Sequence, residues 1–424
     1  MQNNQDEPAT MKNIVAISPG NTGGGAEKVA YTICKELHLR GYNSKMLARK
    51  IDYSADPLVK EFVQPVPGPD LLYSAGNLLD DIFSTQYLFY LSTWRIPFLK
   101  LVRQSDVIHL HNIHGYYFNL LALPTLMNVK PVVWTLYDMW AFTGKCVWSF
   151  DCERYAEHCG NCPQLSAYPV MKHDRSRFQL GLKKMLYANK KFVIVAPSAW
   201  LQSHVNNSIL RDVPSFVIPS SVDTKIFFPE DKSQARKRMG IPQDKKVILF
   251  IASWINSIQH KGIDTFKELL SILYKNRTDI YTLIVGHLQG KSVLGDEYAG
   301  KETGWVSDPD ILRACYSSAD IFVSPTLADN SPCTVVEAMA CGTAVVAYKT
   351  GGIPEQVNHG ETGWLVRSGD KKALFDAIVN LLDDPEKRNR FGKAGSKRVL
   401  DHFTLDIFIK KYIDVSQEAM RLKR

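Results

Sequence analysis

The stretch that decides the fold is SPTLADNSPCTVVEAMACGTAVVAYKTGGIPEQV, residues 324–357. The apolar run DIFVSP (320–325) predicts a buried strand, CTVVEAMAC predicts a helix, and AVVAYK (344–349) predicts the next strand. A strand, a helix and a strand in this order are typical of a mostly parallel α/β sheet. Ser331 is a suitable N-cap and Pro332 a suitable first helical residue, so we expect the helix to begin here.

Two carboxylates, Asp329 and Glu337, lie on either side of this helix start with seven residues between them. The backbone amides of Cys333 and Thr334 would point out of the helix N-terminus at the carboxyl end of a parallel strand, where α/β folds bind anions. Glu337 can accept hydrogen bonds from a vicinal diol such as ribose, and Asp329 from hydroxyls at the other end of the ligand. The spacing therefore predicts a nucleotide sugar, and we expect Glu337 to serve that ligand and not the core.

The N-terminal half opens with the same kind of pattern. NIVAIS (13–18) predicts a buried strand, PGNTGGG (19–25) a glycine-rich loop, and the following apolar periodicity a helix that ends at Gly41. The prolines and polar residues of 216–231 indicate a crossover between domains. We predict two α/β domains with a cleft between them, and the remaining expected strands are the apolar runs at 106–112, 131–136 and 192–198.

Length and composition agree with a globular protein of two domains. The 424 residues carry a net charge of +8, which favours anionic partners such as nucleotides or phospholipid without requiring nucleic acid. No stretch has about twenty uninterrupted apolar residues, so we do not expect a transmembrane helix. The nearest candidate, 87–102, is interrupted by Arg95, Pro97 and Lys100, and we interpret it as a kinked core-facing helix in preference to a membrane-surface element. The polar first ten residues do not read as a secretory signal, and we expect a cytoplasmic protein.

On these residues the chain resembles glycosyltransferase family 4, retaining enzymes of the GT-B fold. An acidic residue, seven residues, a glutamate, AMACG and GGIPE are the family's mark, with Asp329 in place of its more usual glutamate. GNTGGGAEKVA (20–30) and HKG (260–262) match further family motifs, so the resemblance covers nearly the whole chain. WTLYDMWAFTGKC (134–146) with CGNCPQL (159–165) narrows it to members that build bacterial exopolysaccharide, capsule or lipopolysaccharide.

The resemblance implies roles for individual residues. Lys261 would be the cation on the departing diphosphate, and Gly24 and Gly25 would approach the donor phosphate or the acceptor closely. The family usually has an arginine five residues before this lysine, where the chain has Asn256. Its closest members have a histidine near the reacting centre where the chain has Tyr137, which can still donate a hydrogen bond to phosphate or sugar.

The implied architecture is two Rossmann-like domains facing each other across a cleft. The acceptor-binding domain would occupy residues 1–218 and the donor-binding domain 219–400, with a C-terminal helix over 401–424 packing back on the first domain. The implied reaction moves a hexose from a nucleotide diphosphate to a hydroxyl of a growing, lipid-linked glycan, with peripheral contact to the plasma membrane as an added expectation. No cofactor or catalytic metal is implied, because Lys261 and the helix amides supply the positive charge.

Two other classes of function stay open. A nucleotide-sugar 2-epimerase shares this fold, but its cleft needs acid and base carboxylates from the N-terminal domain. A non-catalytic subunit of a glycan-assembly complex is the second alternative, because Asn256 and Tyr137 depart from the family pattern.

A histidine cluster, HLHNIHG, contains His109, His111 and His114. Alternation along a strand places His109 and His111 on the same face, where they can hold a metal, although the carboxylate partners of a typical site are missing nearby. We expect His111 and His114 to lie at the cleft rim and to contact the acceptor.

Four cysteines, Cys146, Cys152, Cys159 and Cys162, follow the spacing C-x5-C-x6-C-x2-C. Four thiols this close in sequence can bind a structural zinc ion tetrahedrally, and free thiols or a disulfide formed after isolation are the alternatives.

Overall fold

The computed structural model describes residues 11–53, 63–188, 191–252, 260–286, 292, 294–295 and 297–423. The chain divides into two compact units. We call them the N-terminal unit (Met1–Ala196, Leu201–Ile218 and Ile409–Arg424) and the C-terminal unit (Pro197–Trp200 and Pro219–Phe408).

The N-terminal unit is built on a seven-stranded parallel sheet with the order β3-β2-β1-β4-β5-β6-β7. The chain winds outward from β1 in one direction and from β4 in the other, which is the doubly wound order, so the direction reverses between β1 and β4. The strands are β1 (Asn13–Gly20), β2 (Asn43–Lys50), β3 (Val63–Pro65), β4 (Val107–His111), β5 (Val132–Thr135), β6 (Phe192–Ala196) and β7 (Ser215–Val217).

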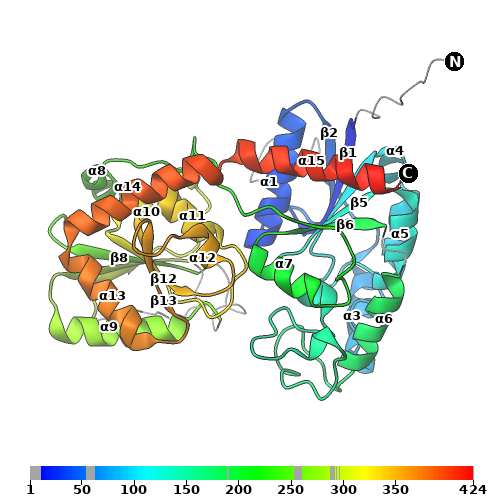
Figure 1. The fold of residues 1–424 in the computed structure, drawn as a ribbon, viewed down its shortest axis with the longest axis horizontal. Helices are drawn as coiled ribbons and strands as arrows, with labels where there is room; N and C mark the ends of the chain where they lie inside the picture. The colour runs from blue at the N-terminus through cyan, green and yellow to red at the C-terminus, as the bar shows by residue number, and fades with distance from the viewer. Residues whose placement is uncertain are drawn as a thin grey trace. The chain divides into compact units, whose positions relative to one another are not determined.

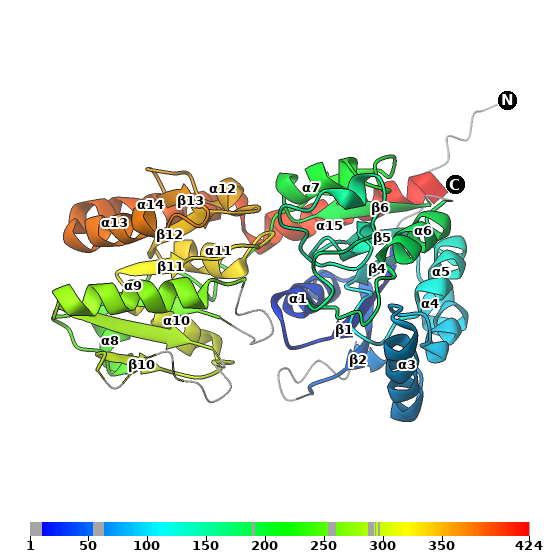
Figure 2. The ribbon, with the colours of Figure 1, turned by 90° about the horizontal axis from the view of Figure 1, so that it is seen from below.

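Helices cover both faces of this sheet. On one face α1 buries Ala30 and Cys34 against Ala16 and Met46 of the first two strands. Figures 1 and 2 show α4, α5 and α6 on the opposite face. The helices that begin in this part of the chain are α1 (Gly25–Leu39), α3 (Asp70–Phe83), α4 (Lys100–Gln104), α5 (Leu123–Val129), α6 (Ser176–Leu186) and α7 (Ala199–Asn206), with short 3-10 helices η1 (Leu91–Phe98), η2 (Leu120–Ala122), η3 (Trp140–Phe142) and η4 (Arg154–Ala156).

The stretch 87–102 forms two short helices in place of the kinked core-facing helix that the sequence analysis predicts. The 3-10 helix η1 contains Pro97, the extended residue Leu99 ends it, and α4 then begins at Lys100. Trp94 and Phe98 are exposed. The prediction was wrong because the extended Leu99 separates η1 from α4, and apolar side chains of η1 lie both in the core and on the surface.

The last helix, α15 (Leu405–Lys423), packs on the N-terminal unit. Ser416 Oγ lies 2.8 Å from His109 Nε2 of β4, and Tyr412 OH lies 3.1 Å from Thr135 Oγ1 of β5. Lys423 Nζ donates to the Met127 carbonyl at 2.6 Å. The end of the chain is therefore tied to the centre of the first sheet.

The C-terminal unit repeats the architecture. Its six-stranded parallel sheet has the order β10-β9-β8-β11-β12-β13, so the winding direction reverses between β8 and β11. This confirms the prediction of two Rossmann-like domains. The strands are β8 (Lys246–Ile251), β9 (Ile280–Val285), β10 (Gly300–Glu302), β11 (Ile321–Ser324), β12 (Ala344–Lys349) and β13 (Gly363–Arg367).

The helices of the C-terminal unit also pack on both sheet faces. Leu270 of α9 and Leu381 of α13 lie in the core on one face, and Tyr316 of α10 and Val336 of α11 lie in the core on the other (Figure 1). The helices are α8 (Lys232–Met239), α9 (Ile263–Asn276), α10 (Pro309–Ser318), α11 (Cys333–Ala340), α12 (Ile353–Gln356), α13 (Lys371–Asp383) and α14 (Pro385–His402).

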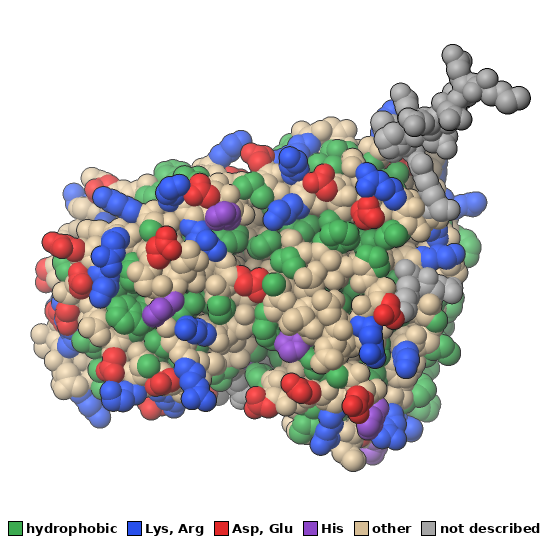
Figure 3. Space-filling model, in the orientation of Figure 1, with side chains coloured by type: hydrophobic (Ala, Val, Ile, Leu, Met, Phe, Trp, Pro, Cys, Tyr) green, Lys and Arg blue, Asp and Glu red, His purple; other side chains and the backbone are tan. Residues whose placement is uncertain are grey.

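The surface charge is mixed. On the face drawn in Figure 3, lysine and arginine side chains alternate with acidic ones, and no large area carries one sign alone. In the described part of the chain, no helix is both long enough and apolar enough to cross a membrane.

Candidate functional site

A pocket lies at the point of the C-terminal sheet where the winding direction reverses. Open parallel sheets bind their ligands at this position. Lys261 and Asp329, which are 68 residues apart in sequence, meet here. The lining residues are Phe250, Ile251, Ala252, Lys261, Val323, Ser324, Thr326, Asp329 and Thr334. The structure thus brings three of the predicted site residues together and adds Ser324 and Thr326, which the sequence analysis did not single out.

Lys261 and Asp329 form an ion pair between Nζ and Oδ2. The two side chains are 27% and 13% exposed, so the pair is partly buried while the ammonium keeps access to solvent. A carboxylate in this position orients the ammonium toward the pocket. A phosphate oxygen that enters the pocket meets a positioned cation, and Asp329 remains beside it as an acceptor for hydroxyl groups.

The backbone around this pair is held by the carbonyl of His260. It accepts hydrogen bonds from Leu327 N at 2.6 Å and from Thr326 Oγ1 at 3.0 Å. Burial and the neighbouring Lys261 lower the pKa of His260 to about 4, so its ring is neutral at neutral pH. The segment that carries Lys261 is therefore fastened to the loop that carries Asp329, without adding a second positive charge.

Two glycines explain why these loops lie so close. Gly262 has φ +77°, and a Cβ there would lie 1.9 Å from the Pro325 carbonyl oxygen. Gly351 has φ +54°, and a Cβ there would lie 1.6 Å from the Asp329 carbonyl oxygen. Both positions combine a left-handed backbone with a close backbone approach, which only glycine tolerates. The glycine pair that follows the predicted helix thus shapes the loop of Asp329.

The N-terminus of α11 has no side-chain cap. Pro332 is at the N-cap position, and the predicted cap, Ser331, instead accepts hydrogen bonds from Ser220 N at 3.2 Å and Gln356 Nε2 at 3.0 Å. The prediction that Ser331 caps the helix was wrong, because other loops use its hydroxyl. Thr334 of the first turn lines the pocket, so no capping side chain competes with an anion there.

Glu337 lies one turn further along α11, on the same side as Thr334. Its side chain is buried, with the residue 6% exposed, and Oε2 accepts a hydrogen bond from Tyr316 OH at 2.7 Å. Burial, with the Glu337 carboxylate second, raises the pKa of Tyr316 well above its usual value, so Tyr316 stays a donor. The expectation that Glu337 serves a ligand and not the core was wrong in its second part. Its contact with ribose stays a prediction.

Comparison with known proteins identifies the two units. The model of Glycosyltransferase Family 4 matches residues 23–226, and that of Glycosyl transferases group 1 matches residues 231–398. The chain belongs to glycosyltransferase family 4. This confirms the resemblance drawn from the sequence.

The individual curated relatives of this glycosyltransferase are distant from it in sequence. The lipopolysaccharide core biosynthesis mannosyltransferase LpsB of Rhizobium meliloti is 29% identical over 243 residues, covering 54% of this chain and 68% of LpsB. Other curated relatives are matched over only 41% to 62% of their own length.

Solved structures share the fold over nearly the whole chain. Sucrose-phosphate synthase of Thermosynechococcus elongatus superimposes with a TM-score of 0.70 at 19% identity, covering 97% of this chain and 99% of that one. Anabaena HepE in complex with UDP does so with a TM-score of 0.66 at 16% identity, covering 95% and 98%. Both are GT-B neighbours, so the glycosyltransferase has the GT-B type of architecture.

The structure of Glu337 leads to a prediction for this glycosyltransferase. Glu337→Ala should lower both the melting temperature and donor affinity, because it removes a buried partner of Tyr316 and the predicted ribose acceptor. The free energy of unfolding and the free energy of donor binding should each fall by about 1.5–3 kcal/mol. Tyr316→Phe is the control, since it removes only the internal bond. If both variants bind a nucleotide sugar equally well in calorimetry, Glu337 does not contact ribose.

The glycine-rich loop of the N-terminal unit joins β1 to α1. Gly24 is the N-cap of α1, and a Cβ there would meet only the flexible Glu27 Oε2, at 2.8 Å. A Cβ on Gly25 would meet nothing within 4 Å. Packing in the described chain therefore does not require either glycine, and their approach to a ligand stays a prediction. Gly23, with φ +126°, is the residue whose backbone favours glycine, and the sequence analysis missed it.

The histidines of the cluster are buried, and the predicted contact of His111 and His114 with the acceptor stays a prediction. His111 is 0% exposed and its Nδ1 lies 2.9 Å from Tyr137 OH, and His114 is 9% exposed with Nε2 2.8 Å from Asp138 Oδ2. The rings of His109 and His111 are 6.2 Å apart, which confirms that they share a face. Burial lowers the pKa of both, to about 4 for His109. The buried ring of His111 contacts Tyr137, and the ring of His114 contacts Asp138, so the two histidines position these side chains.

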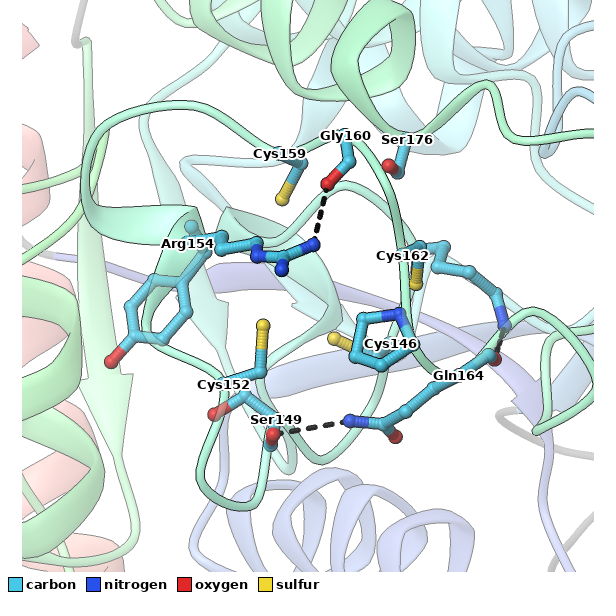
Figure 4. Close-up of a pocket in the computed structure, with 12 residues that line it drawn as sticks. Cys146, Ser149, Cys152, Arg154, Cys159, Gly160, Cys162, Gln164 and Ser176 are labelled. Carbon is cyan, nitrogen blue, oxygen red and sulfur yellow. Dashed lines mark hydrogen bonds between the residues drawn. The ribbon is translucent and has the colours of Figure 1, made fainter.

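The four cysteines line one pocket of the N-terminal unit (Figure 4). All are free thiols, and Gly144 N donates to Cys159 Sγ at 3.3 Å. Among the residues that the structure describes, no three histidine, cysteine or acidic side chains are placed to hold a metal ion. Structural zinc therefore stays a prediction, and Asn256 lies outside the described residues.

The prediction of a structural zinc ion can be tested by measuring the zinc content of the purified protein. Protein purified without chelator should contain about one zinc per chain, and Cys162→Ser should lose it, because a tetrahedral site needs all four thiolates. Cys315→Ala, a buried cysteine of the C-terminal unit, is the control and should keep the metal. Eight titratable thiols in a metal-free wild-type protein, measured after denaturation, would show that the cluster is reduced and empty.

Proposed function

We propose that this glycosyltransferase moves a hexose from a nucleotide diphosphate to a hydroxyl of a growing, lipid-linked glycan of the bacterial surface, with retention of anomeric configuration. The observation that carries the donor part is the Lys261–Asp329 pair beside the uncapped N-terminus of α11, in one pocket at the reversal point of a parallel sheet. Positive groups there suit a diphosphate. The complex of HepE with UDP supports a nucleotide donor.

The proposed mechanism uses electrostatics in place of a metal. Lys261 and the amides of Cys333 and Thr334 stabilise the charge that develops on the leaving diphosphate. Asp329 accepts hydrogen bonds from sugar hydroxyls once the diphosphate has engaged Lys261, and Glu337 accepts from ribose. A phosphate oxygen of the donor takes the proton of the acceptor hydroxyl, so no side-chain base is needed. Tyr137, fixed by His111, donates to the donor phosphate or sugar.

The acceptor assignment rests on the relatives. LpsB, the relative at 29% identity, is a mannosyltransferase of lipopolysaccharide core biosynthesis. A lipid-linked surface glycan is therefore the acceptor class that we propose, bound by the N-terminal unit.

The test is a product analysis with the full chain. Nucleotide hexoses of uracil, guanine and adenine are incubated with a lipid-linked glycan fraction, with and without excess EDTA. We expect nucleoside diphosphate release, an elongated glycan with the donor's anomeric configuration, and no immediate effect of EDTA. Net isomerisation of the donor would indicate an epimerase. Neither reaction with any donor would favour a non-catalytic subunit. Activity that EDTA abolishes and Mg²⁺ or Mn²⁺ restores would contradict the metal-free mechanism.

A further inference from the structure

Two exposed tyrosines of the N-terminal unit lie side by side. Tyr116 is 40% exposed and Tyr168 is 39% exposed, although they come from loops that are distant in sequence. Their ring centroids are 6.3 Å apart, and the ring planes make an angle of 63°. The two rings therefore form a corner of aromatic surface, which we call the tyrosine corner. Aromatic rings on loops are well suited to bind ligands when the core does not use their faces.

Buried aromatic side chains support the tyrosine corner. The ring of Tyr87, a residue that is 1% exposed, packs edge-on against Tyr116 with the centroids 5.4 Å apart. The same ring lies 5.2 Å from the ring of Trp140, which in turn lies 5.3 Å from the ring of His114. Packed neighbours thus hold Tyr116 in place before any ligand arrives, which lowers the entropic cost of binding.

The backbone of Tyr116 has an unfavourable conformation. Its φ of +65° is left-handed, which is rare for a bulky residue, and a glycine would adopt this conformation without strain. Strained residues of this kind persist where the surrounding structure holds them, and they are common at binding sites. The loop therefore carries a large aromatic side chain at a position whose backbone favours glycine, which suggests a use for the ring.

The tyrosine corner adjoins the segment that follows β5. In this segment Asp138 comes directly after Tyr137, and its Oδ1 accepts a hydrogen bond from Trp140 N at 2.8 Å. Asp138 Oδ2 lies 2.8 Å from His114 Nε2, so the two residues that support the corner also position this carboxylate. His114 Nδ1 has no hydrogen-bond partner among the described residues. Hydrogen-bonding capacity is thus left unused beside the corner.

Carboxylates lie near the tyrosine corner. Burial raises the pKa of Tyr168 above its usual value, and the nearby carboxylates of Asp138 and Glu27 raise it further. Glu27 belongs to the first turn of α1, directly after the glycine-rich loop. Carboxylate oxygens accept hydrogen bonds from hydroxyl groups and repel anions. The surroundings of the corner therefore suit a ligand that has hydroxyl groups and no negative charge.

We propose that the tyrosine corner binds the sugar residue of the acceptor that receives the hexose, and that this residue is an uncharged pyranose. The C–H groups on one side of the pyranose ring lie on a tyrosine face, because an aromatic face carries a partial negative charge. Hydroxyl groups of the ring donate to Asp138 and Glu27. A uronic acid would place its own carboxylate against these two. The inference rests on the proposed function and names the chemistry of its acceptor.

Saturation-transfer NMR with the full chain tests the proposal. The probes are the methyl glycosides of glucose, galactose, mannose and N-acetylglucosamine, with the methyl glycoside of glucuronic acid as the anionic probe. We expect at least one neutral probe to bind, with the strongest transfer to the C–H groups on one side of its ring, and the glucuronide not to bind. Tyr116→Ala with Tyr168→Ala should weaken binding at least about fivefold, since two aromatic contacts are lost.

Matched variants make the test specific. Tyr116→Phe with Tyr168→Phe keeps both rings and should bind the neutral probe. Phe178→Ala removes an aromatic side chain of α6 that is 50% exposed, and it should bind as the wild type does. Glu27→Gln should bind the glucuronide better than the wild type does, because one of the two repelling charges is lost.

Three outcomes would overturn the proposal. The first is that no neutral probe binds the wild type, and the second is that the double alanine variant binds like the Phe178→Ala control. The third is that the wild type binds the glucuronide as well as the neutral probes. Binding of a polyprenyl phosphate that the alanine variant loses, without binding of any glycoside, would assign the corner to the lipid instead.

Calorimetry with nucleoside diphosphates separates this proposal from the proposed function. The double alanine variant should bind a nucleoside diphosphate as the wild type does, because the C-terminal pocket is unchanged, and this result also shows that the variant is folded. A wild type that binds a nucleoside diphosphate but no neutral glycoside would overturn the tyrosine corner alone. Glycoside binding without nucleoside diphosphate binding would instead contradict the proposed donor site.

Discussion

Replacement of Lys261 by alanine should slow nucleoside diphosphate release about a hundredfold to a thousandfold, with a smaller effect on donor affinity. The ammonium faces the charge that grows as the sugar leaves, and a preorganised group of this kind contributes about 2.7–4 kcal/mol to the transition state. The ion pair strengthens the expectation, because without Lys261 the Asp329 carboxylate faces the diphosphate with no cation between them.

Three variants make this prediction specific. Lys267→Ala removes an exposed lysine of α9, the helix that begins two residues after Lys261, and should retain wild-type turnover. Lys261→Arg should restore little, because a planar guanidinium does not occupy the place of an ammonium. Lys261→Ala combined with Asp329→Asn should be less impaired in donor binding than Lys261→Ala alone, since the repulsion is relieved. Wild-type turnover in Lys261→Ala would place the diphosphate elsewhere.

Gly351→Ala should destabilise the C-terminal unit by about 2–5 kcal/mol and abolish donor binding. The sum combines about 1–2 kcal/mol for a left-handed alanine with about 1–3 kcal/mol for overpacking, because the new methyl group would meet the Asp329 carbonyl. Moving that carbonyl displaces Asp329 from Lys261. The measurement is thermal unfolding with and without a nucleotide sugar.

Gly360→Ala separates the two contributions. Gly360 has φ +80°, but a Cβ there would meet nothing within 4 Å. Gly360→Ala should therefore lower the free energy of unfolding by only about 1–2 kcal/mol and leave donor binding intact. If Gly351→Ala behaved like Gly360→Ala, the close approach of the two loops would not matter for the site.

The sequence predicts the sheets and their helices well, because these depend on local periodicity. The strands β4, β5 and β6 follow from the apolar runs at 106–112, 131–136 and 192–198. The stretch 87–102 fails for a local reason as well, since Pro97 and the extended Leu99 break what the apolar composition alone would continue.

Only part of the candidate site can be predicted from the sequence. The resemblance to the family assigns Lys261 and Asp329 to one donor site, and the structure places the two side chains together at the reversal point of the sheet. Ser331 bonds with Ser220 and Gln356, and Glu337 bonds with Tyr316. These partners are distant in sequence, so no local pattern predicts the contacts. The contact of His109 with Ser416 of α15 likewise joins segments that are distant in sequence.

The most direct test of the C-terminal pocket as the donor site is calorimetric titration of UDP, GDP and ADP into the full chain and into Lys261→Ala. We predict that at least one nucleoside diphosphate binds the wild type and that its affinity falls in the variant, while Lys267→Ala binds it unchanged. Failure of all three to bind the wild type, or equal binding by Lys261→Ala, would contradict the assignment of this pocket to a nucleotide-sugar donor.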